Sequence, residues 1–306
     1  MIQEKENELK ICIIGCGRLG LTLALAISKA NNPKISIVSA ASRTDKSLNY
    51  AKRILNKYKE NILFTKDNLL AASVSNCIFI CTPDDKIQQV CEEISTRSNL
   101  KQKSVIYFSG LKKISILDLA KKAGASVACM HPIKSFANVL QSVKTLSGTL
   151  YGITYDKEDM NIQAVINKLL NLLNGKPIYV EDNKKALYHI SACIASNFLV
   201  SLIDTAIETG KLLELNPEIF LNGLLNLSEG TLKNIKKVGS KKALTGPIAR
   251  GDLDTIKEHI NSLKELDRND LLLIYKCLGE KTAKIALENE WINNKIYQDL
   301  LLILNN

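Results

Sequence analysis

The stretch LKICIIGCGRLGLTLALAISKA, residues 9–30, decides the fold class. It joins an apolar β-type run to a glycine-rich turn and then to an apolar segment with helical spacing. A strand, a G-x-G-x-x-G turn and a helix in this order form the phosphate-binding unit of a dinucleotide-binding Rossmann sheet. Gly15 permits the tight turn, Gly17 lets the backbone approach a pyrophosphate, and Gly20 lets helix and strand pack closely. The residues predicted to hold the diphosphate are Gly15, Gly17, Arg18, Leu19 and Gly20.

Further β-type runs follow and alternate with amphipathic segments as far as residue 182. They end at or near residues 40, 63, 81, 109, 130, 155 and 180. This alternation is typical of a doubly wound sheet with helices on both faces. The predicted fold class is therefore α/β, with an N-terminal Rossmann domain over residues 1–182.

After residue 182 the sequence changes character, because no β-type run recurs and apolar residues repeat at helical spacing. The pattern predicts an all-helical domain over residues 183–306, joined directly to the last strand. Helices are expected near residues 183–213, 217–236, 253–265, 268–288 and 290–304. The run SKKALTGPIARGD, residues 240–252, interrupts them because it contains two glycines and a proline.

Composition narrows the class of protein. With 46% hydrophobic and 24% charged residues, the chain of 306 residues is typical of a globular protein. The N-terminal MIQEKENELK is charged where a signal peptide needs an apolar core, and no unbroken apolar run is long enough to span a bilayer. We therefore expect a soluble cytoplasmic protein without a membrane partner.

Charge and cysteine usage argue against nucleic acid and metal. The net charge is +10, but the lysines are scattered and aromatic residues make up only 5% of the chain. The eight cysteines lack C-x-x-C pairs with accompanying histidines, so reduced thiols and no metal site are predicted. An excess of basic over acidic residues is also typical of an enzyme that acts on small anions, because a positive cleft attracts phosphates and carboxylates.

The end of the second strand indicates the cofactor. Sites that prefer NAD place an acidic residue there to bind the ribose hydroxyl. Here the sequence is SAASRT, so Ser42 and Arg43 stand where the 2′-phosphate of NADP(H) would lie. We predict NADP(H), with a solvated Arg43 as the alternative. Residues at later strand ends complete the predicted cofactor site: Thr82, Pro83, Ser109 and Gly110.

The segment KKALYHISACIASNF, residues 184–198, carries the densest set of reactive side chains. Helical spacing places Lys185, His189 and Ser196 on one face, with Asn197 beside it. Lys185 is a candidate proton donor, and Ser196 or Asn197 could hold a carboxylate or hydroxyl. His189 and His131 compete with the lysine as acids, and a lysine near a helix start is also an ordinary solvated residue.

The second candidate set is LTGPIARGD, residues 244–252. Its glycines and proline indicate a loop of forced shape that could present Arg250 to a substrate carboxylate. The alternative is a helix connection in which Asp252 caps the following helix. The residues alone leave both open.

Taken together, GCGRLG, the SR pair, CTPDD, SG, HP, KALYH…ASN and TGPIARGD resemble a known family from about residue 9 to residue 290. It comprises bacterial Rossmann-like proteins with a C-terminal helical domain, some of which are alternative-type ketopantoate reductases. More distantly, the chain is similar to the 6-phosphogluconate dehydrogenase-like superfamily, whose active sites lie between two such domains. The resemblance implies reduction of 2-dehydropantoate to pantoate with NADPH, a step of pantothenate and coenzyme A synthesis.

The resemblance also bears on the site. Lys185 and Asn197 occupy positions similar to those of the lysine general acid and the asparagine of classical ketopantoate reductases. His189 departs from that pattern, because an asparagine is expected one turn after the lysine. The leading hypothesis is therefore an NADPH-dependent reductase of a small anionic 2-oxo acid, forming a homodimer. The alternatives are an imine reductase of the pyrroline-5-carboxylate reductase type and a non-catalytic NADP-binding protein.

Overall fold

A computed structural model describes residues 8–58 and 61–306. The chain divides into two compact units, Met1–Ser196 and Asn197–Asn306, called unit 1 and unit 2 below. Residues 183–196, which the sequence assigns to the helical domain, thus group with the sheet. Each unit is described by itself.

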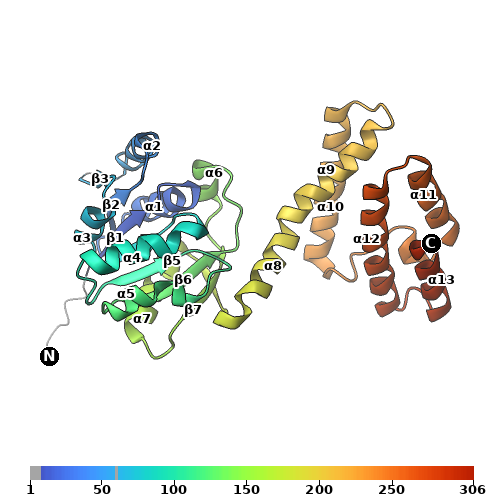
Figure 1. Ribbon diagram of the computed structural model, residues 1–306. Coiled ribbons are helices and arrows are strands. Elements are labelled where there is room, and N and C mark those ends of the chain that lie inside the picture. The colour runs from blue at the N-terminus through green and yellow to red at the C-terminus, as the bar shows by residue number, and fades with distance from the viewer. Residues whose placement is uncertain (1–7, 59–60) are drawn as a thin grey trace. The chain divides into compact units, whose positions relative to one another are not determined.

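Unit 1 is built on a sheet of eight strands in the order β3-β2-β1-β4-β5-β6-β7-β8 (Figure 1). The strands are β1 Leu9–Ile14, β2 Ile35–Ala41, β3 Leu63–Thr65, β4 Cys77–Ile80, β5 Ser104–Tyr107, β6 Ser126–Pro132, β7 Leu150–Tyr155 and β8 Lys176–Tyr179. Every predicted strand is present, and neighbours are parallel except for the antiparallel pair β6 and β7. The predicted α/β fold with an N-terminal Rossmann domain is confirmed.

Helices cover both faces of this sheet (Figure 1). The helices of unit 1 are α1 Arg18–Ala30, α2 Asp45–Leu55, α3 Asn68–Ser73, α4 Ile87–Arg97, α5 Asp118–Lys122, α6 Val139–Lys144, α7 Met160–Leu173 and α8 Lys185–Ala195, with 3-10 turns η1 Asp84–Lys86, η2 Ile114–Leu117 and η3 Asp182–Lys184. Of these, α8 does not cover the sheet, and only its Lys185 is buried. One hydrophobic core joins the sheet to α1, α2, α6 and α7, and a second joins its other face to α3, α4 and α5. Because both faces are covered, the central strands are almost continuously apolar.

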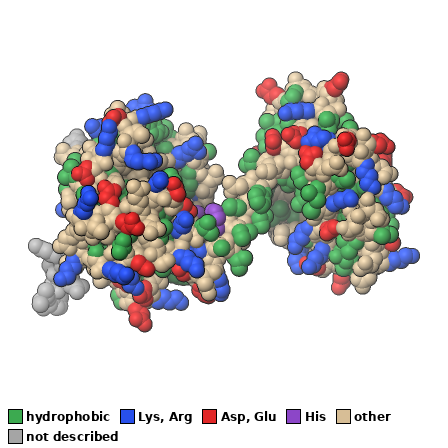
Figure 2. All heavy atoms as spheres, viewed as in Figure 1, with side chains coloured by type: hydrophobic (Ala, Val, Ile, Leu, Met, Phe, Trp, Pro, Cys, Tyr) green, Lys and Arg blue, Asp and Glu red, His purple; other side chains and the backbone are tan. Residues whose placement is uncertain are grey.

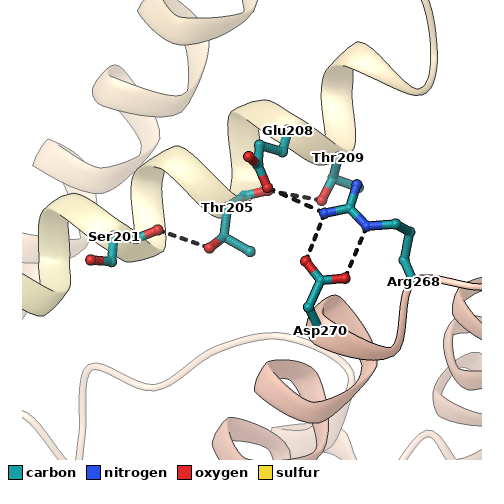
Figure 3. A network of polar contacts seen from close by, with 6 residues as sticks. All are labelled: Ser201, Thr205, Glu208, Thr209, Arg268 and Asp270. Carbon is teal, nitrogen blue, oxygen red and sulfur yellow. Dashed lines mark hydrogen bonds and ion pairs between the residues drawn. The ribbon is translucent and has the colours of Figure 1, made fainter.

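Unit 2 is entirely helical within the residues described. Its elements are α9 Asn197–Lys211, α10 Pro217–Val238, η4 Ile248–Arg250, α11 Leu253–Glu265, α12 Asn269–Glu288 and α13 Asn294–Asn305. Its core lies among η4, α11, α12 and α13. Figure 3 shows Arg268, just before α12, donating to Asp270 at 2.7 Å and to Glu208 of α9 at 3.3 Å. This network ties α9 to the start of α12.

The helix expected over residues 183–213 is interrupted. The backbone of Ser196 leaves helical geometry (φ −121°, ψ −66°), so α8 ends and α9 begins at this point. In contrast to the sequence expectation, the helical stretch Asp182–Lys211 has the length and composition of a membrane span. Length and composition alone are weak evidence of a membrane protein, and this stretch includes ionisable residues such as Lys185 and Asp204.

Candidate active site

A cavity of about 610 Å³ lies at the carboxyl ends of β1, β2 and β4 and is called the cofactor cavity below. Its lining includes most of the predicted cofactor residues: Gly15, Gly17, Ser42, Arg43, Thr82 and Pro83. Sequence reasoning missed the rest of its polar lining, which comes from α2, α3, η1 and α4: Ser47, Asn68, Lys86, Gln89 and Glu93. Only tertiary structure brings these together.

The loop at the mouth of this cavity contains three glycines, and each has a different role. Gly15 has φ +108°, and a Cβ there would lie 2.7 Å from the carbonyl carbon of Cys81. A side chain at this position is therefore excluded by strain and by contact. Gly17 has ordinary backbone angles and no atom within 4 Å of a Cβ position, so a side chain there would enter open space. Gly20 faces the Gly15 carbonyl and lets α1 pack against the loop.

The cavity carries the polar groups that a dinucleotide phosphate requires. Gly17 is the N-cap of α1, so the unpaired N–H groups of the first turn face this end of the helix. The hydroxyl oxygen of Thr82 is buried without a hydrogen-bond partner, although Thr82 lines the cavity. Such an orphaned group needs a partner, which a bound ligand would supply. Arg43 is exposed at the rim beside Ser42, as a 2′-phosphate site requires.

The other predicted cofactor residues have different surroundings. Arg18 and Leu19 begin α1 but do not line the cavity. Ser109 is buried and donates to Asp84 at 2.6 Å, and it accepts from the backbone N–H of Lys112. Ser109 therefore ties the end of β5 to the turn after β4.

Gly110 lies in a second polar cluster, at the carboxyl ends of β5 and β6. We call the side chains of His131, Tyr188 and His189 around Gly110 the histidine cluster. A Cβ on Gly110 would lie 2.8 Å from Nδ1 of His189 and 2.9 Å from Cε1 of His131. The two imidazole centroids are 6.2 Å apart. Both rings pack close against Gly110, so a side chain at this position would clash with them.

The histidine cluster is partly buried and partly unpaired. Nδ1 of His131 and the hydroxyl oxygen of Tyr188 are 2.9 Å apart. Burial lowers the pKa of His131 to about 4, and the nearby His189 and Lys185 add to the effect. His131 is therefore neutral at pH 7. Nδ1 of His189 is buried without a partner, while its Nε2 lies 3.5 Å from Sγ of Cys193. An oxygen atom of a ligand would satisfy the orphaned nitrogen.

Lys185 lies beside this cluster but is turned into unit 1. It is only 2% exposed, and its amine contacts the Ser109 carbonyl oxygen (3.1 Å), Sγ of Cys129 (2.9 Å) and the Tyr107 hydroxyl oxygen (3.3 Å). Three protein atoms therefore engage the amine. Helical spacing predicted the shared face of Lys185 and His189, but it could not show how deeply the lysine is buried.

The remaining predicted residues are exposed. Ser196 ends α8, and Asn197 begins α9 in unit 2. Arg250 ends η4, also in unit 2. Asp252 caps α11, accepting from the backbone N–H of Thr255 at 3.1 Å, as the alternative interpretation of TGPIARGD expects. The catalytic roles of Ser196, Asn197 and Arg250 stay predictions.

In and beside the histidine cluster, sequence reasoning also missed Tyr188 and Cys129. Tyr188 stands directly before His189, and its hydroxyl group fits against Gly152 of β7, where a Cβ would clash. Only the glycine in the strand LYGITY gave a signal for this close approach. Cys129 gave none, because a cysteine in an apolar strand is ordinarily a packing residue.

Two protein families match parts of the chain. Residues 10–109 match the family described as NADP oxidoreductase, coenzyme F420-dependent. Residues 149–282 match a family described as a domain of unknown function, DUF2520. Among curated proteins, no sequence matches this chain.

Solved structures share the fold along nearly the whole chain. A protein of Thermotoga maritima is 23% identical, with a TM-score of 0.70, over 92% of this chain and 99% of that one. A Bacteroides fragilis protein assigned provisionally as an NADP oxidoreductase is 17% identical, with a TM-score of 0.72, over 92% and 100%. A Plasmodium falciparum pyrroline carboxylate reductase with NADP bound is 16% identical, with a TM-score of 0.56, over 91% and 98%.

These comparisons bear first on the cofactor. The NADP oxidoreductase match covers the glycine loop, Ser42, Arg43, Thr82 and Pro83, all of which line the cofactor cavity. The predicted NADP(H) cofactor is therefore confirmed, and the N-terminal part of the chain is of the NADP-dependent oxidoreductase type.

Proposed function

We propose that the protein is an NADPH-dependent reductase of a small anionic 2-oxo acid, with 2-dehydropantoate as the first candidate substrate. One observation carries the proposal: Nδ1 of His189 is buried and unpaired beside Gly110, on the sheet edge that also holds the cofactor cavity. A carbonyl oxygen of the substrate would supply the missing partner.

The spacing of the strands supports this assignment. The cofactor cavity lies at the ends of β1, β2 and β4, and the histidine cluster lies at the ends of β5 and β6. Neighbouring strands are about 4.8 Å apart, so β4 and β6 are separated by roughly 10 Å. A dinucleotide held by the glycine loop, with its 2′-phosphate at Arg43, would bring its hydride to this edge of the sheet, where the histidine cluster lies.

The chemistry of the cluster favours a carbonyl over an imine. Hydride transfer to a carbonyl carbon develops negative charge on oxygen, which neutral N–H donors stabilise. A protonated imine is a cation, and a carboxylate would suit it better. Asp84 is the acidic group that acts electrostatically on His131, but its carboxylate is held by the Ser109 hydroxyl.

Imine reduction is the second candidate. Its support is the shared fold with pyrroline carboxylate reductase over 91% of this chain. The third possibility is an NADP-binding protein without turnover, which would leave the histidine cluster unexplained.

We also propose a cytoplasmic homodimer that pairs through unit 2. This unit has an apolar groove of about 530 Å³ between α9, α11 and α12. Figure 2 shows hydrophobic side chains exposed over unit 2, and large ones on its helices include Phe198, Val200 and Ile219. Apolar surface of this kind is typical of protein interfaces. Sedimentation of the purified protein at several concentrations tests the dimer.

The deciding experiment follows NADPH absorbance with the purified full-length protein. Oxidation of NADPH with 2-dehydropantoate and not with pyrroline-5-carboxylate supports the proposal. The reverse result assigns imine reduction. Tight NADPH binding without oxidation across a panel of 2-oxo acids and cyclic imines would reject both enzymatic assignments.

A further inference from the structure

Three candidate acids lie near the end of β6, and their surroundings differ. The amine of Lys185 is enclosed by protein atoms. Nδ1 of His189 is buried, and its Nε2 faces Cys193. In the residues that the structure describes, Nε2 of His131 has no hydrogen-bond partner and is not among the buried unpaired atoms. His131 is therefore the candidate whose unpaired ring nitrogen is not fully buried.

Tyr188 bears on which nitrogen of His131 carries the proton. The hydroxyl group of Tyr188 lies against Gly152 of β7. Its own proton has two acceptors, Nδ1 of His131 at 2.9 Å and the His131 carbonyl oxygen at 3.3 Å. The tautomer of His131 sets the direction of the 2.9 Å contact, and donation from Tyr188 to Nδ1 is the arrangement that the inference below takes. Because Nδ1 then accepts, a neutral imidazole must carry its hydrogen on Nε2.

We infer that His131 donates the proton that neutralises the reduced substrate, through Nε2, and that Tyr188 is the positioning residue that fixes this tautomer. The inference rests on the proposed function and deepens it. Bound NADPH would supply the hydride to the carbonyl carbon, and the electron pair of the C=O π bond would then go to the oxygen. That oxygen takes the proton of Nε2, and water then returns a proton to the ring, so one proton is consumed in each turnover.

The electrostatic surroundings of His131 agree with a neutral donor. His189 and Lys185 of α8 disfavour its protonation, and Asp84 of η1 opposes them more weakly. Burial holds the pKa of the Tyr188 hydroxyl near 12, so it keeps its proton at neutral pH. The rate should therefore not follow an ordinary histidine titration between pH 5 and pH 8.

The activity test uses a matched pair of variants. His131→Asn places an amide N–H near the position of Nδ1, whereas His131→Gln places one near Nε2. We expect kcat to fall about 100-fold in His131→Asn and roughly 10-fold in His131→Gln. In Tyr188→Phe we expect a loss of about 10-fold in kcat. The Kd for NADPH should stay unchanged in all of them, which also shows that each variant is folded.

A second measurement does not depend on turnover. The chain has only three histidines, so nitrogen-15 NMR with single His→Asn variants can assign each ring. We expect a neutral His131 at pH 6 with its proton on Nε2, and loss of this preference in Tyr188→Phe. A proton on Nδ1, or wild-type kcat in His131→Asn, would overturn the inference. A wild-type protein that oxidises no NADPH would instead reject the proposed function.

Discussion

The cofactor cavity and the histidine cluster lie at the same edge of one sheet but are built in opposite ways. The cavity is formed around the backbone of the glycine loop, and its lining residues come from several segments between Ile14 and Glu93. The histidine cluster is formed by side chains from β6 and α8 that are 57 residues apart. Both need a glycine whose absent side chain leaves room, Gly17 in one and Gly110 in the other. The comparison shows that a local motif can identify a cofactor while the chemistry depends on tertiary contacts.

We expect the largest effects when each of these two glycines is replaced by alanine, because one variant should weaken NADPH binding and the other should lower kcat. Gly17→Ala adds a methyl group in open space, where the diphosphate is expected, so the protein should fold normally and its Kd for NADPH should rise about 100-fold. Gly110→Ala adds a methyl group between His131 and His189, so NADPH binding should persist while kcat falls about 100-fold. Fluorescence titration and initial rates measure the two quantities.

Gly223→Ala is the control for this pair, because no atom lies within 4 Å of a Cβ on Gly223 and the residue belongs to α10 of unit 2. It should change neither Kd nor kcat. Equal losses of cofactor binding in Gly17→Ala and Gly110→Ala would show that the two regions are one site.

The next prediction concerns the free energy of unfolding, which should depend on pH because of His131. Its pKa falls from 6.5 in the unfolded chain to about 4 in the fold, so the folded state resists protonation. The resulting stability is fully present above pH 6.5 and is lost as pH falls from 6.5 toward 4, for a loss of about 3 kcal/mol. Urea unfolding at several pH values should show this loss in wild type. His131→Asn should lack it, and identical pH profiles would contradict the lowered pKa.

The fold could be predicted from sequence because its signals are local. All eight strands follow from short β-branched runs such as LKICII and NCIFIC. No local signal in the sequence indicates that β7 runs antiparallel to β6, or that the helix is interrupted at Ser196. Apolar periodicity continues through Ser196, and strand direction depends on how the chain crosses the sheet.

The candidate site was harder to predict from the sequence than the fold, for a physical reason. Spacing shows which residues share a helix face, so it placed Lys185 and His189 together. It cannot show that Tyr107, Ser109 and Cys129 enclose the Lys185 amine, because those residues come from other strands. Nor could it identify Tyr188, whose contacts lie on β6 and β7.

A smaller effect tests the choice of cofactor at Arg43. Loss of a guanidinium that binds a phosphate dianion costs about 1.5 to 3 kcal/mol, so Arg43→Ala should raise the Kd for NADPH by roughly 10- to 150-fold. The Kd for NADH should not change. Arg97→Ala, which removes the same charge outside the cofactor cavity, is the control. An unchanged ratio of the two Kd values would remove Arg43 from this role.

The smallest expected effect concerns Lys185, where the two interpretations of the site differ most clearly. A lysine that donates the proton should lose almost all kcat on substitution and little stability. A lysine enclosed by three protein atoms should do the reverse, because Lys185→Met removes buried polar contacts while nearly preserving side-chain length. We expect the free energy of unfolding to fall by about 2 kcal/mol and kcat to fall by about fivefold, roughly 1 kcal/mol in the barrier. A loss of 100-fold in kcat with unchanged urea unfolding would instead assign the proton to Lys185 and return His131 to a supporting role.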